Sequence, residues 1–154
     1  MMNLYRLIYS SYAKPDLGYH DLKDIMEKSE RNNQSDGITG LLCYGDSIFL
    51  QILEGDSCGA LRYRKIVSKT YHRIALDTRH HTPELIECIP IESRLFGIWS
   101  MKAVNFSNLN SQEVRNLILK YSTSTTLQPH TMTSQQCLNL MQALVTVYDK
   151  AASF

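Results

Sequence analysis

The stretch GDSIFLQILEG, residues 45–55, decides how the fold of this 154-residue chain is interpreted. It is typical of a short strand between Gly45 and Gly55, because apolar residues fill both of its alternating faces. Gln51 interrupts that apolar run, and its amide brings two donors and an acceptor that need partners. The residues alone leave two interpretations open: the amide satisfies a neighbouring backbone group, or it serves a function.

The bulk composition describes an ordinary globular protein. Apolar residues make up 44% of the chain and charged residues 20%, and 154 residues are enough for one domain with a real core. Sixteen basic and fifteen acidic side chains give a net charge of +1, and no block of Lys or Arg forms a stripe. Nucleic acid is therefore not an expected partner.

Cysteine usage and the first residues bear on the compartment. The four cysteines, Cys43, Cys58, Cys88 and Cys137, lie far apart and form no CxxC pair. The start, MMNLYRLIYSSY, has neither the basic region nor the long apolar stretch of a signal peptide, and no run approaches the length of a membrane span. We expect reduced thiols in a cytoplasmic protein without a membrane segment, with Cys43 a small buried hydrophobe.

The elements expected around residues 45–55 follow the order βαββαββ. Strands are predicted at 4–11, 38–44, 48–53, 85–91 and 98–104, and helices at 20–31 and from about Ile66 to Asp77. Ser35-Asp36-Gly37 and Gly45-Asp46 are expected turns, and Pro90 indicates an edge strand. The order predicts an α+β, ferredoxin-like sandwich with two helices on one face of a five-stranded mixed sheet.

The remaining residues predict a helical extension. A helix is expected over Ser111–Tyr121 with Ser111 as N-cap, and another over Thr133–Tyr148, joined by a polar connector. The chain thus divides into a domain over residues 1–105 and a C-terminal helical extension over residues 106–154.

Period-two counting brings a phenol toward the amide of Gln51. Phe49, Gln51 and Leu53 share one face of their strand, and Tyr5, Leu7 and Tyr9 share one face of the first strand. If both faces point at the helices, Tyr9 and Gln51 meet in an apolar layer. Tyr9 is otherwise an ordinary core aromatic.

The other polar candidates carry weaker signals. His80 and His81, expected near the end of the second helix, are adjacent and cannot both face one metal from a regular element, so no metal site is predicted. There is neither a GxSxG elbow nor a phosphate-binding glycine loop. Arg73 and Arg79 either bind a phosphate or cover a helix end. Asn32 and Asn33 would ordinarily cap the first helix, and Trp99 would ordinarily lie in the core.

Read together, the segments of the chain resemble a known family. These segments are LYRLIYSS, RNNQSDGITGLLCY, FLQILEG, TYHRI, RHHTPELIEC and FGIWSM. In this order they resemble the BLUF domain, a blue-light sensor that uses flavin. The tail, KYSTSTTLQPHTM followed by SQQCL, resembles the short cyanobacterial PixD-type proteins, which add two C-terminal helices to that domain.

The resemblance implies a non-covalently bound flavin, usually FAD with FMN as the alternative, between the two helices on the sheet. It implies that Tyr9 is the photoactive tyrosine and Gln51 the switching glutamine, with Trp99 and Met101 as the strand-five pair that carries the signal. It further implies the following flavin-binding residues: Tyr9, Ser29, Asn32, Asn33, Gln51, Arg73, Arg79 and His80.

The resemblance also implies a function without substrate turnover. Excited flavin takes an electron and then a proton from Tyr9, and Gln51 settles rotated or tautomerised, with a changed hydrogen bond to the flavin. Strand five and the tail helices then carry the output. PixD-type relatives imply a ring-like, decameric homo-oligomer, a response-regulator partner of the PixE type, and phototaxis.

One segment departs from the family pattern. SCGALRYR separates LEGD from the second helix, an insertion of several residues around Cys58–Arg64. It is either a longer surface loop, which costs little closure entropy, or a shift of the helix that carries Arg73.

Two other functions compete with a photoreceptor. Small ferredoxin-like domains include acylphosphatases, in which an Arg and an Asn converge on a phosphate, and here Arg6 and Asn33 are the candidates. A light-indifferent oligomeric binding module, with Tyr9 and Gln51 simply in the core, is the other alternative.

Overall fold

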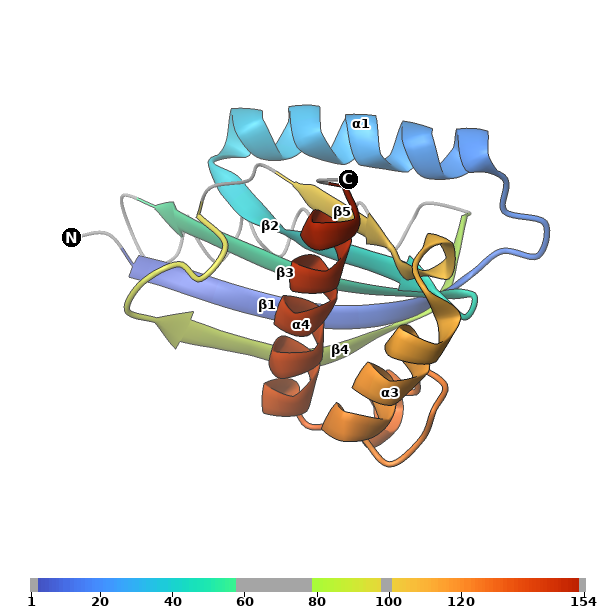
Figure 1. The fold of residues 1–154 in the computed structure, drawn as a ribbon. Coiled ribbons are helices and arrows are strands. Elements are labelled where there is room, and N and C mark those ends of the chain that lie inside the picture. Colours follow the sequence, from blue (N-terminus) through green and yellow to red (C-terminus); the bar gives the residue numbers. More distant parts are fainter. Residues whose placement is uncertain (1–2, 58–78, 98–100, 153–154) are drawn as a thin grey trace.

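The computed structural model describes residues 3–57, 79–97 and 101–152, and within them a mixed sheet carries helices on both faces (Figure 1). The five-stranded sheet has the order β4-β1-β3-β2-β5, with β2 and β5 parallel and the other pairs antiparallel. The strands are β1 (Asn3–Ala13), β2 (Ile38–Gly45), β3 (Ile48–Ser57), β4 (His80–Ile91) and β5 (Lys102–Asn105). The predicted five-stranded mixed sheet is confirmed. The second predicted helix lies outside the described residues.

The edge position predicted from Pro90 is confirmed, because β4 is an end strand of the sheet. The strand begins at His80, however, and not at Leu85 as predicted. Its pairing with β1 shifts register between Ile8 and Tyr9 and again between Ser10 and Tyr12, and Thr82 has a φ of 48°. Such irregularities break the period-two pattern, which is why the sequence did not show the first half of this strand.

The first helix, α1 (Tyr19–Asp36), is longer than the predicted 20–31. Gly37, with a φ of 70°, ends it in the left-handed region that glycine adopts without strain, and its N–H donates to the Asn33 carbonyl. Asn32 and Asn33 therefore lie inside the helix and do not form its cap. The prediction failed because asparagine usually favours helix ends, whereas here the helix continues to the next glycine.

The C-terminal residues form η1 (Phe106–Asn108), α3 (Ser111–Tyr121), η2 (Pro129–Thr131) and α4 (Ser134–Ala152). The N-cap of α3 is Asn110 and not Ser111 as predicted, because the Asn110 carboxamide oxygen accepts from the Glu113 N–H at 3.0 Å. At the start of α4, Thr133 and Gln136 exchange side-chain-to-backbone hydrogen bonds of 3.1 and 2.8 Å, a capping box.

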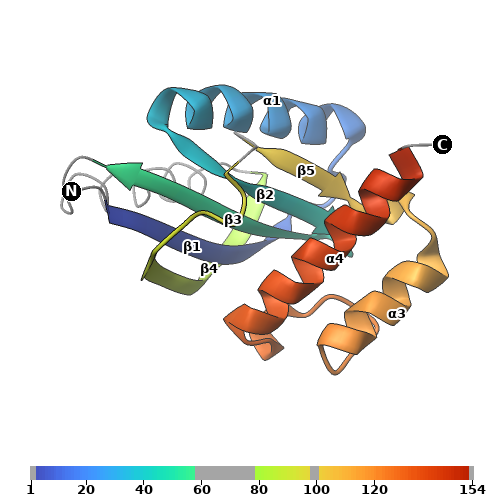
Figure 2. The same ribbon diagram turned by 60° about the vertical axis from the view of Figure 1, so that its left-hand side comes forward.

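The sheet separates two apolar layers, with α1 on one face and α3 and α4 on the other (Figure 2). What we call the α1 face carries buried Leu7, Tyr9, Leu42, Phe49 and Leu53. What we call the α4 face carries Ile8, Leu41, Cys43, Leu50 and Ile52, which join a large hydrophobic cluster with α3 and α4. The predicted alternation of β1 and β3 is thus confirmed. The division at residue 105 stays a prediction.

Cys43 is buried on the α4 face, as expected, and burial raises the pKa of its thiol. Cys88 and Cys137 are also free thiols. Among the helices in the described part of the chain, none is long and apolar enough to cross a membrane.

The hairpin turn between β2 and β3 is fastened to the C-terminal helices. Asp46 and Ser47 adopt φ values of 52° and 61°, the left-handed pair that suits a tight hairpin. The Asp46 carboxylate accepts from two nitrogens of the Arg115 guanidinium, at 2.8 and 2.9 Å, and from the Leu127 N–H at 2.9 Å. Arg115 also donates to the Thr125 carbonyl at 2.8 Å. This turn clamp joins the hairpin to α3 and to the connector between α3 and α4.

We predict that the turn clamp stabilises the fold in a pH-dependent way. Burial alone would raise the pKa of Asp46, but the hydrogen bonds from Arg115 and Leu127 and the Arg115 charge outweigh it, so the pKa lies below its ordinary value. The contribution is therefore complete above about pH 4, the unfolded pKa, and is lost as the pH falls through the folded pKa. Asp46→Asn should cost about 1 kcal/mol at pH 7, because the pair is partly exposed.

Urea unfolding of wild type and Asp46→Asn between pH 2.5 and 7 measures this difference. Ser47→Asn is the control: asparagine tolerates a positive φ, and the clamp is intact in that variant. A difference that stayed constant down to pH 2.5 would show that the Asp46 charge is not its source.

Candidate functional site

The structure brings Tyr9 and Gln51 together on the α1 face. The two residues are directly opposite in the antiparallel pairing of β1 with β3. The Tyr9 hydroxyl donates a hydrogen bond to the Gln51 carboxamide oxygen, Oε1. The Tyr9 side chain is fully buried and Gln51 is 2% exposed. Phenol and amide therefore form a polar pair inside an apolar layer.

The other end of the Gln51 amide contacts a third residue. Its Nε2 donates to the Met101 thioether sulfur at 3.4 Å, and Met101 lies half-buried immediately before β5. A thioether sulfur is a weak acceptor, so this is the weaker of the two bonds. Within the described residues, no buried side-chain nitrogen or oxygen lacks a hydrogen-bond partner. The amide is thus held at both ends, with a strong contact to the phenol and a soft one to the sulfur.

The predicted residues of α1 differ in how deeply they lie. Asn33 is 2% exposed and lies four residues after half-buried Ser29, on the helix face that also carries buried Leu22 and Ile25. The amide of Asn33 therefore belongs to the layer between α1 and the sheet, the same layer as Tyr9 and Gln51. Asn32 is exposed, and its role in a pocket stays a prediction.

Arg79 is held against the N-terminal half of α1. Its Nη1 donates to the Asp24 carboxylate at 2.7 Å and to the Asp21 carbonyl at 3.4 Å. The hydrogen bond from Arg79, followed by that from Lys28, holds the pKa of Asp24 below its ordinary value. The predicted role of Arg79 toward a phosphate stays a prediction.

Three other predicted site residues are only partly placed or not placed. His80 is the first residue of β4 and pairs with Ala13. The second helix, near whose end it was expected, lies outside the described residues. The side chain of His80 is outside the description. Arg73 and Trp99, together with the insertion around Cys58–Arg64, lie outside the described residues.

The Arg–Asn pair of the acylphosphatase alternative does not converge. Arg6 points to the α4 face and forms a 2.9 Å ion pair with Glu54, whose side chain is fully buried. Asn33 lies on α1, across the sheet.

Glu54 was not among the predicted site residues. Period-two counting places it with Leu50 and Ile52 on a buried strand face, and a polar residue on an apolar strand is the same signal that drew attention to Gln51.

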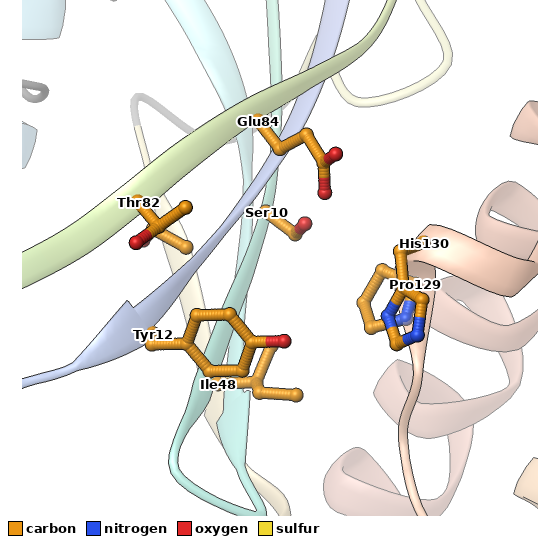
Figure 3. A pocket seen from close by; sticks show the side chains of 8 residues that line it. Ser10, Tyr12, Ile48, Thr82, Glu84, Pro129 and His130 are labelled. Atoms are coloured by element: carbon orange, nitrogen blue, oxygen red, sulfur yellow. The ribbon is translucent and has the colours of Figure 1, made fainter.

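A small pocket lies away from the Tyr9–Gln51 pair, between β1, β4 and η2 (Figure 3). Tyr12, Glu84 and His130 point into it. The remaining lining residues are Ser10, Ser11, Ile48, Thr82 and Pro129. Within the described ranges, no group of three or more His, Cys, Asp or Glu side chains could hold a metal ion.

Comparison with known proteins shows which family model and which relatives the chain resembles. Residues 4–102 match the family model described as "BLUF: Sensors of blue-light using FAD". The photoactivated adenylate cyclase subunit beta of Euglena gracilis is 29% identical over 123 residues, which is 77% of this chain. The chain spans only 14% of that relative.

Two solved structures resemble the chain over most of its length. The photo-activated state of BlsA has a TM-score of 0.76 and 26% identity, and the match covers 92% of this chain and 94% of BlsA. The dark state of BlrB, described as a BLUF protein, has a TM-score of 0.71 and 26% identity, and the match covers 100% of this chain and 99% of BlrB. Both matches therefore extend into the C-terminal helices.

The Tyr9–Gln51 contact predicts a specific pattern of stability. Tyr9→Phe leaves the buried Gln51 oxygen without its donor and should cost about 1–3 kcal/mol. Tyr9→Phe combined with Gln51→Met replaces both partners with apolar groups of similar shape and should recover most of that loss. Urea unfolding of the ligand-free wild type, of Tyr9→Phe and Gln51→Met singly, and of the double variant measures these losses. If the double variant lost the sum of the two single losses, the two side chains would not be coupled.

Proposed function

The chain belongs to the BLUF family, the sensors of blue light that use FAD, and from this premise we propose that Tyr9, Gln51 and Met101 are its light-responsive group. A BLUF domain is by itself a sensing module and not an enzyme. The observation that carries the proposal is the Gln51 amide, which is buried and bound to Tyr9 at one end and to Met101 at the other.

The residues of the α1 face fit a flavin. Flavin is a large flat ring with a polar edge, and such ligands bind between apolar walls that carry a few placed donors and acceptors. Buried Leu42 and Phe49 supply apolar walls, and Gln51 and Asn33 supply amides in the same layer. We propose that Gln51 and Asn33 hold the polar edge of FAD, with FMN as the alternative ligand.

Other residues are assigned to the rest of the cofactor. We propose that Ser29 and Asn32 flank the ring and that Arg73, Arg79 and His80 hold the ribityl and phosphate end. The support for Arg79 is its position beside α1, where Asp24 and the Asp21 carbonyl fix the guanidinium at a known place. The other assignments rest on the family motifs.

The photochemistry comes from the cofactor, and the proton contacts come from the chain. When bound, flavin absorbs blue light and in its excited state accepts an electron and a proton from a nearby phenol. Tyr9 can supply both and take both back, and its O–H already points at Gln51 Oε1. The Gln51 amide can then settle in a rotated or tautomerised form that bonds differently to its neighbours.

Rotation of the amide has a specific consequence for Met101. A half-turn exchanges Oε1 with Nε2, so the amide oxygen faces the Met101 sulfur in place of the N–H donor. Two acceptors do not attract each other, so the contact that holds Met101 is lost. One hydrogen bond in a dry site contributes about 1 kcal/mol, which is enough to shift a balanced two-state element. Tautomerisation moves one Nε2 proton to Oε1 and leaves one N–H on Nε2, which can still donate to Met101.

A displacement of Met101 acts on α4 through the next residue. Met101 and Ala103 point to the α1 face, whereas Lys102 reaches the α4 side, where its Nζ lies 3.1 Å from the Asp149 carboxylate. The same ammonium is 5.3 Å from the centre of the Tyr148 ring. We propose that these contacts transmit the change at Gln51 to the C-terminal helix.

The downstream partner is also a proposal. The tail segments that resemble PixD-type proteins support a ring-like, decameric homo-oligomer and a response regulator of the PixE type, in a phototaxis pathway in the cytoplasm. Trp99 is proposed to share the signalling role with Met101.

We predict that the purified protein is yellow and that its flavin absorption moves reversibly to longer wavelength under blue light. Tyr9→Phe and Gln51→Ala should retain the colour and lose this shift, because each removes one partner of the switching pair. Tyr121→Phe, on α3 across the sheet, is the control and should behave as wild type. A colourless protein that neither FAD nor FMN reconstitutes would refute the assignment, and a full shift in either site variant would refute the roles of Tyr9 and Gln51.

We also predict that Lys102→Met uncouples α4 from the site. The ion pair and ring contact are partly exposed, so the variant should lose about 1 kcal/mol or less of stability. Hydrogen exchange of the last turns of α4 should become faster in the dark, and the difference between light and dark should shrink. Asp149→Asn, which keeps the ring contact, should show part of this effect. An undiminished light-induced difference in Lys102→Met would exclude this route.

A further inference from the structure

The buried carboxylate of Glu54 on the α4 face binds three N–H donors. It accepts from Arg6 Nε at 2.9 Å, from the Leu95 backbone N–H at 3.1 Å and from the Phe96 backbone N–H at 2.7 Å. The Glu54 side chain is completely buried. A buried charge is tolerated only with such partners, so this arrangement is demanding in its geometry.

The two backbone donors belong to the connection between the two edge strands. Residues 92–97 leave β4 at one edge of the sheet, and the chain must reach β5 at the other edge. Figure 2 shows this segment crossing the strands on the side that carries α4. Glu54, near the end of the central strand β3, binds the connection midway across. We call residues 92–97 the crossing segment.

Side chains of the crossing segment make further contacts that fix it against the sheet. The Arg94 guanidinium donates to Thr39 Oγ1 at 2.8 Å, to the Gly37 carbonyl at 2.9 Å and to the Glu54 carbonyl at 3.2 Å. Phe96 is buried in the hydrophobic cluster shared with α3 and α4. The path of the chain is therefore set up to the end of the crossing segment, four residues before Met101.

Glu54 is linked along the chain to both residues of the contact between Gln51 and Met101. It lies three residues after Gln51 on the same strand, and its hydrogen-bond partner Phe96 lies five residues before Met101. We propose that Glu54 is a positioning residue that sets where Met101 meets the Gln51 amide, and thereby the flavin spectrum and the rate of dark recovery. This inference rests on the proposed function.

The length and charge of the side chain both matter to this role. Aspartate keeps the charge opposite Arg6 but is one methylene shorter, so Leu95 and Phe96 must move toward β3 or lose their acceptor. Glutamine keeps the length, but its amide has a single oxygen to accept and leaves Arg6 without a charged partner. Glu54→Asp is therefore the variant that shifts the crossing segment while the buried charge pair is retained.

The first experiment observes Met101 directly. In protein labelled with 13C at the methionine methyl groups, the Met101 signal is assigned by its loss in Met101→Leu. Glu54→Asp should move this signal, and Arg94→Ala, which removes only the outer tethers, should move it less. Should Glu54→Asp fail to fold, Arg94→Ala decides. An unmoved Met101 signal in the folded variant would overturn the proposal.

The second experiment tests whether Glu54 acts through Met101. Glu54→Asp should shift the dark flavin absorption and change the dark-recovery rate by about threefold or more, the range that one hydrogen bond provides. In a Met101→Leu background the same substitution should have little further effect. Independent, additive effects of the two substitutions would overturn the proposal.

A stability control separates positioning from general destabilisation. Ile118→Val alters the core at α3 on the α4 face and should lower the unfolding midpoint without moving the Met101 signal or the recovery rate. If it moved them as Glu54→Asp does, the proposal would fail. A wild-type protein without a light response would refute the proposed function. The methyl signal does not require photochemistry, so it would still show whether Glu54 sets the position of Met101.

Discussion

The site depends on the cross-strand register that places Tyr9 opposite Gln51. Ten consecutive residues of β1, from Asn3 to Tyr12, pair with β3 without interruption. A slip of one residue would turn every side chain of one strand to the other face and would separate the phenol from the amide by the thickness of the sheet. The apolar residues of both faces prevent such a slip, because each face is buried under helices. The polar pair is thus held in place by the apolar residues around it.

The sequence predicts this part of the fold well because the period of a strand is local information. Alternation in β1 and β3 shows which side chains share a face. The helical spacing of Leu22, Ile25, Met26 and Ser29 predicts a helix there, of which Met26 is exposed and the other three face inward. Features that depend on contacts between distant segments could not be predicted from the sequence. Asn33 continues a helix that local propensity would end, and register shifts conceal the first half of β4. Period-two counting places Glu54 on a buried strand face, but the two backbone N–H groups that bind it belong to residues some forty positions away in the chain.

The sheet also separates the site from the helices that are proposed to respond to it. Tyr9, Gln51 and Met101 lie on the α1 face, whereas α3 and α4 pack on the α4 face. Hydrogen bonds do not pass through a layer of packed strands, so any coupling must use residues that reach both sides. Alternation at β5 supplies such a place, because Met101 and Lys102 are neighbours in the chain and point to opposite faces. The crossing segment lies on the α4 face, where Phe96 joins the cluster under α4.

The broad apolar surface beneath α3 and α4 limits how freely the domain could be reused. The region matched to the family ends at residue 102, whereas Ile8, Leu41, Leu50 and Ile52 are covered by helices that begin after it. A fusion carrying only the matched region would present this surface to water and would need a substitute cover from its new neighbour. Any domain that replaced α3 and α4 would then lie against Lys102. In such a fusion, the surface that binds the new domain would also be the surface through which the light-induced change reaches it.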